Sequence, residues 1–554
     1  MIEIDSNSAS HNFQSETETE KDNSRNVDRR QQDLRLVLSG KKLALAFTGL
    51  LLSILLVALD QTIVATALPV IASQFSALDQ VTWIASAYFL TQSGFLLLYG
   101  KLLTIFDRKW VYLVAIMIFE IGSLFCGIAM NATFLIFGRA VAGIGAAGIF
   151  VSCITIISEI TLLKDRPKLF GAFGAVFGAS SVIGPLMGGA FTDHISWRWC
   201  FFINLPIGAI TLTTVGMIIK RNPPEGVILS QKLRELDYIG AVLALGMITS
   251  LVLPLQWGGN LYPWNSKQVI ISLCFVAVLI PVFAIWEKYG VGNERAILPM
   301  KFFSNRTVVA ACIENFFIFF GLLLTVYYLP LQFQAVKGHS ATQSGIDILP
   351  YMLSNVLAAG ISGFVISATG HYWPFLIFGP LIVAIGAGLM YTFSYISTTA
   401  QLIGYQIIFG AGLGFVMQNT VFSLLSVILT SEMIAVQADV DHHDIPQASA
   451  LCSFMQLVGG VLGIAVAGTI FSNELVSHLQ RVAPDAPLVA IQQSVTVIRH
   501  LDPAMQEVVK KAYVRALDYV YLTGVPVGII ASICGLFIKR HNIKGKEMMT
   551  TGGA

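Results

Sequence analysis

The chain has 554 residues, of which 55% are hydrophobic and only 12% are charged, and its net charge is +2 at pH 7. Soluble domains contain about 25% charged residues, so this composition excludes an ordinary soluble domain and indicates an integral membrane protein. The seven cysteines lie in or beside apolar runs without zinc-type spacing, which predicts buried small side chains rather than metal ligands.

Residues 1–42 are polar and rich in charge, with few aromatic or branched apolar side chains. Such a segment buries too little apolar surface to fold, so we expect a disordered cytoplasmic tail. It also lacks the basic start, short apolar core and cleavage site of a signal peptide. The apolar run that begins at Leu43 is therefore predicted to be a retained membrane helix.

A helix that spans a bilayer needs about 20 consecutive, mostly apolar residues. Fourteen stretches of the chain meet this requirement, which predicts an all-α polytopic membrane protein with 14 transmembrane helices. The predicted helices cover 43–67, 82–103, 110–130, 133–156, 168–192, 200–219, 237–257, 268–287, 306–330, 343–366, 373–394, 400–430, 448–471 and 518–538.

The distribution of basic residues predicts the orientation, because Lys and Arg accumulate in short cytoplasmic loops. With a cytoplasmic N-terminus, four inner loops and the C-terminal tail carry 17 basic residues, among them Arg108 and Lys109. The short outer loops carry only Arg198, Lys267 and Lys337. We therefore expect both termini to face the cytoplasm.

An internal repeat relates the first six helices to the last six. Arg139 and Gly143 in the fourth helix correspond to Gln406 and Gly410 in the twelfth. Repeated six-helix halves are typical of transporters that bind substrate between the halves. The predicted organisation is a tail (1–42), an N-terminal half (43–219), a central two-helix insert with flanking loops (220–305), a C-terminal half (306–540, with an outer loop at 472–517) and a cytoplasmic tail (541–554).

The fifth helix is unusually rich in glycine and contains a proline. Each interior Gly weakens a helix in water by about 1 kcal/mol relative to Ala, whereas in a membrane small residues let neighbouring helices approach closely. This pattern suits helices that slide or rock against each other. The residues are Gly174, Gly178, Gly184, Pro185, Gly188 and Gly189.

Ionisable side chains within membrane helices are costly and are candidates for function. Asp60 in the first helix corresponds to Gly321 in the repeat, so packing alone does not require its carboxylate. Arg139 in the fourth helix keeps its proton and can act as a fixed charge beside a carboxylate. Glu120 and Glu314 are further candidates, either for a proton or for a cationic substrate. The structural alternatives are a carboxylate hydrogen-bonded near a helix end and an arginine that pins the bundle.

These segments together resemble the fourteen-helix drug:proton antiporters of the major facilitator superfamily. The resemblance rests on L-D-x-T-I-V-x-x-A-L-P from Leu59, R-x3-G-x-G from Arg139, and the G-P-x2-G-G run from Gly184. It implies a major facilitator fold arranged as 6 + 2 + 6 helices, and proton-driven export by alternating access. The polar N-terminal tail and long last outer loop look like the fungal branch, which exports toxins, drugs or secondary metabolites.

The resemblance also implies a substrate cavity between the two halves. Polar residues of the first, second, fourth and fifth helices and their counterparts are candidates, although a polar residue in a helix can equally bind another helix. The sixth helix contributes one candidate as well. The candidates are Gln61, Gln92, Asn204, Asn315, Gln418 and Gln456.

The turn between the second and third helices departs from the family pattern. Gly100 and Arg108 are present, but the usual acidic residue after Leu102 is missing, and Asp107 stands where glycine is usual. In the family this turn holds one conformation through charge pairing. Either Asp107 substitutes in that pairing or the cytoplasmic contact is weak.

Two further segments carry open alternatives. Residues 421–433 are either a helical extension or a retained intron in the gene model. The cluster from Asp441 to Asp444 contains two histidines, but it has no further ligands nearby, and we expect a solvated loop rather than a metal site.

The sequence contains no phosphate-binding loop and no catalytic motif of a membrane enzyme. We therefore expect a transporter without a cofactor, driven by a proton gradient, with a small molecule, protons and lipid as its partners and with neither nucleic acid nor an obligate protein partner. The alternatives are a proton-coupled importer, for siderophores or vacuolar basic amino acids, and a non-transporting sensor. The expected location is the cell membrane, with the vacuolar membrane as the alternative; substrate identity and oligomeric state stay open.

Overall fold

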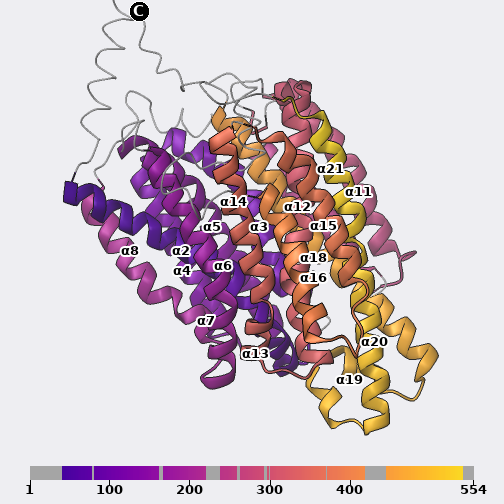
Figure 1. Ribbon diagram of the computed structural model, residues 1–554. Coiled ribbons are helices and arrows are strands. Elements are labelled where there is room, and N and C mark those ends of the chain that lie inside the picture. Colours follow the sequence, from indigo (N-terminus) through magenta and orange to yellow (C-terminus); the bar gives the residue numbers. More distant parts are fainter. Residues whose placement is uncertain are drawn as a thin grey trace, which may run out of the picture.

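The computed structural model describes residues 40–77, 80–160, 166–219, 237–258, 262–291, 296–298, 300–369, 371–417, 445–493 and 495–540. Within these ranges the protein is helical, and 14 of its helical segments are long and apolar enough to cross a membrane. This confirms the predicted fold class and number of spans. Figure 1 shows the helices running side by side as one bundle, with short helices at its lower end.

The N-terminal half and the central insert contain the following helices. They are α2 (Gly40–Phe75), α3 (Val81–Ile105), α4 (Arg108–Gly127), α5 (Ala132–Ile160), α6 (Arg166–His194), α7 (Trp199–Phe202), α8 (Asn204–Ile218), α10 (Tyr238–Trp257), α11 (Lys267–Ile285) and the π-helix η2 (Trp286–Gly290).

The C-terminal half contains both long spans and short connecting helices. They are η3 (Met300–Ser304), α12 (Arg306–Leu331), η4 (Gln332–Val336), α13 (Ala341–Asp347), α14 (Leu349–Thr369), α15 (Trp373–Met390), α16 (Thr399–Val416), α18 (Ile445–Val482), α19 (Leu488–Gln493), η5 (Val495–His500), α20 (Pro503–Leu522) and α21 (Gly524–Phe537).

The helices extend further than apolar runs alone predicted. The segment 472–517, expected to be an outer loop, is mostly helical, because α18 continues to Val482 and α20 begins at Pro503. The amphipathic α20 buries Val509, Ala512 and Tyr513, so tertiary packing supports helix where hydropathy did not indicate a span. The last membrane span accordingly combines α20 with α21. Residues 421–433 and the cluster at 441–444 lie outside the described residues.

Apolar side chains cover much of the outer surface of the bundle. On α11, for example, Ile270, Phe275 and Val278 are all exposed. Continuous apolar surface of this kind is unfavourable in water but is solvated by lipid acyl chains. The exposed face of the insert is therefore a lipid-facing surface.

Matching close contacts support the predicted repeat. A Cβ atom on Gly143 of α5 would collide with the Tyr88 carbonyl of α3, and a Cβ atom on Gly410 of α16 would collide with the Tyr351 carbonyl of α14. The two halves therefore use the same helix-to-backbone contact at positions that the repeat relates. Small residues at such crossings let the helices approach more closely than any side chain would permit.

The central insert contacts both halves. Helix α10 packs on α3 of the N-terminal half and on α18 of the C-terminal half. The Leu245 side chain lies against Gly94 of α3, and the Thr469 hydroxyl of α18 donates to the Leu255 carbonyl. The insert therefore touches helices on both sides of the boundary between the halves.

Replacing Gly410 with alanine tests the close crossing of α16 and α14. We expect Gly410→Ala to lower the free energy of unfolding by about 1–3 kcal/mol, as overpacking does in other proteins. Gly404→Ala is the matched control on the same helix, because a Cβ there would meet nothing within 4 Å. Thermal unfolding in detergent measures both variants, and equal midpoints would contradict the proposed crossing.

Candidate functional site

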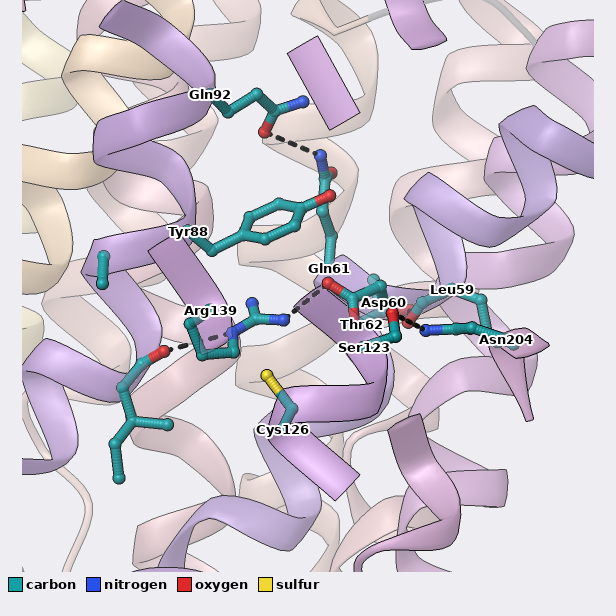
Figure 2. Close-up of polar contacts among 12 residues, drawn as sticks. Leu59, Asp60, Gln61, Thr62, Tyr88, Gln92, Ser123, Cys126, Arg139 and Asn204 are labelled. Carbon is teal, nitrogen blue, oxygen red and sulfur yellow. Dashed lines mark hydrogen bonds and ion pairs between the residues drawn. The ribbon is translucent and has the colours of Figure 1, made fainter. Parts of the chain in front are cut away.

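A buried ion pair joins the first and fourth spans. Arg139 Nη1 of α5 donates to Asp60 Oδ2 of α2 at 2.5 Å, and both side chains are completely shielded from solvent. Figure 2 shows the two side chains pointing toward each other between their helices. The structure thus brings together the two charged residues that the sequence had singled out separately.

Helix α3 completes the surroundings of the guanidinium. Arg139 Nε donates to the Ile84 carbonyl at 3.3 Å, and the Tyr88 ring lies 4.3 Å from the guanidinium carbon. A cation over an aromatic face is stabilised by the ring quadrupole, more strongly when both are desolvated. The role of Tyr88 is not predictable from the sequence, because an aromatic residue in an apolar helix carries no local signal of its role.

The pair keeps unused hydrogen-bonding capacity. Asp60 Oδ1, Arg139 Nη2 and the Tyr88 hydroxyl are buried without a hydrogen-bond partner. Unsatisfied polar atoms in a low-dielectric interior are costly and are rare unless the site has a use for them. The site can therefore accept a proton on the carboxylate or a polar group of a ligand.

Two glutamines and a tyrosine connect this site to the other half. Gln61 Nε2 donates to Gln92 Oε1 at 3.3 Å, and Tyr327 of α12 donates its hydroxyl to the Gln61 carbonyl at 3.2 Å. Gln61 and Gln92 lie beside Tyr88 in Figure 2. Gln61 directly follows Asp60 in α2, and Tyr327 is a contact that the sequence did not reveal.

Asn204 lies beside the Asp60 carboxylate and also binds another helix of its own half. Its Nδ2 donates to Ser123 Oγ of α4 at 3.1 Å, in a fully buried position. One turn before Ser123, the Glu120 carboxylate lies against Gly208 of α8, and both its oxygens are buried without a hydrogen-bond partner. Glu120 is thus held at the contact between α4 and α8 and not in the Asp60–Arg139 pair.

In the C-terminal half, two residues of interest bond to backbone carbonyls. Glu314 is fully buried in α12, and its neighbour Asn315 donates to the Cys452 carbonyl of α18 at 3.3 Å. Gln406, the counterpart of Arg139, donates to a carbonyl of its own helix. Gln456 is partly buried on α18, and Gln418 lies outside the described residues.

The glycine-rich helix α6 packs on both halves. Thr66 of α2 donates its hydroxyl to the Pro185 carbonyl at 3.0 Å. A Cβ on Gly188 would collide with the Ile63 carbonyl of α2, and one on Gly189 would collide with the backbone of α13 in the other half. Gly184 likewise faces Thr62, whereas Gly174 and Gly178 lie earlier in the same helix.

The end of α6 is joined to α13 through a carboxylate. Asp193 accepts hydrogen bonds from the backbone amides of Ala341 at 3.2 Å and Thr342 at 2.6 Å. Gln334 adds a bond from η4 to the Thr66 carbonyl at 2.9 Å. The two halves are therefore hydrogen-bonded at the end of the bundle where α7 and α13 lie (Figure 1).

The turn between α3 and α4 uses its unusual aspartate locally. Asp107 caps α4 by accepting from the Lys109 amide at 3.0 Å, and Arg108 is the first residue of the helix. A Cβ on Gly100 would meet nothing within 4 Å. In the part of the chain described here, no group of three or more acidic, histidine or cysteine side chains could hold a metal ion.

Comparison with known sequences identifies the family. A sequence model described as the Major Facilitator Superfamily matches residues 50–464. The chain belongs to the major facilitator superfamily. It is 41% identical over 517 residues to the Trichophyton rubrum protein "MFS-type efflux pump MFS1", covering 92% of this chain and 94% of that protein. It is 39% identical over 520 residues to the Diaporthe leptostromiformis protein "MFS-type transporter phomT", covering 92% and 85% respectively.

Solved structures of the superfamily share the fold at low identity. An inward-facing, unoccupied structure of a bacterial homologue of the human lysosomal transporter Spinster matches with a TM-score of 0.60 and 15% identity, covering 90% of this chain and 98% of that chain. A D-xylose-proton symporter matches with a TM-score of 0.58 and 13% identity, covering 91% and 100%. The protein is therefore a multi-pass membrane transporter of a small molecule, and not an enzyme.

Breaking the buried ion pair from one side tests its energetics. Arg139→Gln leaves the Asp60 carboxylate without its cation, so we expect unfolding to become easier by about 3–5 kcal/mol. Adding Asp60→Asn replaces the stranded charge with an amide that can bond to Gln, and most of the loss should return. Denaturant unfolding in detergent measures the stability of the wild type, Arg139→Gln, Asp60→Asn and the double variant, which together form a double-mutant cycle. If the stability losses of the two single variants add up to that of the double variant, the side chains do not interact as the distance implies.

Proposed function

We propose that the protein exports small organic molecules (drugs, toxins or secondary metabolites) by alternating access, driven by proton uptake at Asp60. The observation that carries this proposal is the fully buried Asp60–Arg139 pair, with a free carboxylate oxygen inside a membrane helix bundle. A carboxylate is the group in this pair that can change its charge, since arginine keeps its proton. This assigns proton coupling to Asp60 and a fixed charge to Arg139.

Protonation of Asp60 changes the forces that hold α2 against α5. The carboxylate and guanidinium attract strongly in a site without water. A proton on Asp60 removes that attraction and leaves Arg139 with the Tyr88 ring and the Ile84 carbonyl. The helices are then free to shift relative to each other. Departure of the proton re-forms the ion pair and restores the first arrangement.

The contacts between the halves fit one state of an alternating-access cycle. Asp193, Gln334 and Tyr327 all bind backbone groups across the boundary. These contacts lie at the end of the bundle predicted to face outward, so the state is closed to the outside. We infer that they break and re-form in each cycle, while the close backbone crossings within each half persist.

The direction of transport follows from the relatives and not from the geometry. The Trichophyton rubrum relative carries the name efflux pump, and the glycine-rich helix resembles that of exporters. Proton-coupled import, of siderophores or of basic amino acids into a vacuole, is the second candidate. We assign the protein to the cell membrane, with both termini cytoplasmic, and keep the vacuolar membrane as the alternative.

Efflux of a fluorescent cationic dye from expressing cells tests the proposal. We expect efflux to stop when a protonophore collapses the gradient, and to be reduced at least tenfold by Asp60→Asn, which carries no titratable proton. The matched control is Glu507→Gln, the same change on the exposed face of α20, where Glu507 pairs with Lys511. That control should keep wild-type efflux. Efflux that ignores the protonophore would exclude proton coupling, and dye accumulation would indicate import.

Cross-linking α6 to α13 tests whether the halves must separate. The Asp193 side chain contacts Thr342 across the boundary, and cysteines at these two positions form a disulfide only while their Cβ atoms stay within about 4.5 Å. Mild oxidation of Asp193→Cys/Thr342→Cys should stop transport, and a reducing agent should restore it. Each single cysteine variant should keep its activity after oxidation. Undiminished transport by the cross-linked protein would show that this contact stays closed throughout the cycle.

A further inference from the structure

A second pair of buried acidic residues lies at the start of the central insert, separate from Asp60 and Arg139. Asp237 immediately precedes α10, and Glu287 belongs to η2, which continues α11. Their exposed fractions are 5% and 0%. The transport mechanism proposed above uses neither residue, so their burial calls for a separate explanation.

The unpartnered oxygens of the two residues converge on one point. Asp237 Oδ2 and Glu287 Oε1 are buried without a hydrogen-bond partner. A Cβ on Gly240 would fall against Asp237 Oδ2 and 2.8 Å from Glu287 Oε1. The two carboxyl groups lie within hydrogen-bonding reach of each other. Two acceptors therefore face each other with no donor between them.

The remaining oxygens are fully occupied by N–H donors. The Gly240 amide and the Trp286 indole donate to Asp237 Oδ1 at 2.8 and 2.9 Å. The Leu298 amide donates to Glu287 Oε2 at 3.1 Å. These donors stabilise negative charge and offer nothing to a metal ion, which would need further oxygen ligands. The surroundings therefore favour one net negative charge on the pair.

The charged and titratable groups on the neighbouring elements do not supply a cation to the pair. Among the described residues, no ion pair is formed between either carboxylate and a basic side chain. The charged and titratable side chains of α10, η2 and η3 are Tyr238, Lys288, Tyr289 and Lys301, together with the carboxylate Glu287 itself, and α3, on which α10 packs, carries the half-buried Lys101. The first four are exposed, and Lys288 and Lys301 lie over the aromatic rings of Tyr289 and Phe302.

We propose that Asp237 and Glu287 form a proton-binding site, in which one proton from solution is shared between Asp237 Oδ2 and Glu287 Oε1. The proton converts one carboxylate into a carboxylic acid, whose O–H donates to the other carboxylate, and no other bond changes. Such charge-assisted bonds are short and strong. Without the proton, two negative charges face each other in a buried site, which is strongly unfavourable.

The site ties the insert to the pH on its side of the membrane. The shared proton joins the start of α10 to η2, and α10 contacts α3 and α18 on opposite sides of the boundary between the halves. When the proton is lost, repulsion between the two carboxylates weakens the contact between the start of α10 and η2, and the packing of the insert becomes less stable. The proposal holds for either direction of transport, because it rests on contacts of the insert alone.

Thermal unfolding of the purified full-length protein in detergent, across acidic to alkaline pH, tests the site. We expect the wild-type midpoint to fall by several degrees at alkaline pH, because the second carboxylate ionises there. Glu287→Gln supplies a permanent N–H donor in place of the proton, so its midpoint should fall less. Asp237→Asn is the mirror variant and should behave alike. Glu507→Gln, on the exposed face of α20, should keep the wild-type pH dependence.

Each other outcome overturns the proposal. If wild type and both amide variants lose stability equally, the pair does not titrate as one site. If neither amide variant folds, a hydrogen donor cannot replace the proton, and the shared-proton geometry is wrong. If calcium or sodium restores the alkaline midpoint of the wild type but not of Glu287→Gln, the pair holds a metal ion. None of these readouts depends on transport, so they are independent of the dye-efflux result.

Discussion

The ion pair between Asp60 and Arg139 is the interaction on which the N-terminal half depends. A membrane interior offers no water to either charge, so each is tolerable only beside the other. The pair holds α2 against α5, while Tyr88 brings α3 to the same point. One member can take up a proton and the other cannot, so under the proposed mechanism the same interaction both stabilises the bundle and responds to the proton gradient.

Contacts within a half and contacts between the halves follow different rules. Within each half, glycines such as Gly143 and Gly410 let helices cross at backbone distance, and such crossings leave no room for movement. Between the halves, side chains of Asp193, Gln334 and Tyr327 reach backbone groups that water can also satisfy. Hydrogen bonds exchanged with water contribute little net free energy. Under the proposed alternating-access cycle, the boundary between the halves is therefore the part that opens.

The sequence by itself determined the number of spans, the repeat and the charged residues worth attention. Membrane-spanning helices are recognisable in a sequence as long apolar runs, because the side chains that face the bilayer interior are predominantly apolar. For the same reason, Asp60, Arg139 and Glu314 stood out as rare charges in such runs. The family motifs then identified the superfamily. These are local properties, which a chain carries in its order of residues.

Only the tertiary structure decided which of these residues meet. Asn204 and Asn315 proved to bind neighbouring helices, Glu120 lies at a different helix contact from Asp60, and Tyr88 and Tyr327 joined the site without any motif. The segment 472–517 became helical because α20 buries one face against other helices. Pairings such as that of Asp237 with Glu287 join residues far apart in the chain. These pairings are determined by how the helices pack, because no local sequence pattern specifies which faces of two helices contact each other.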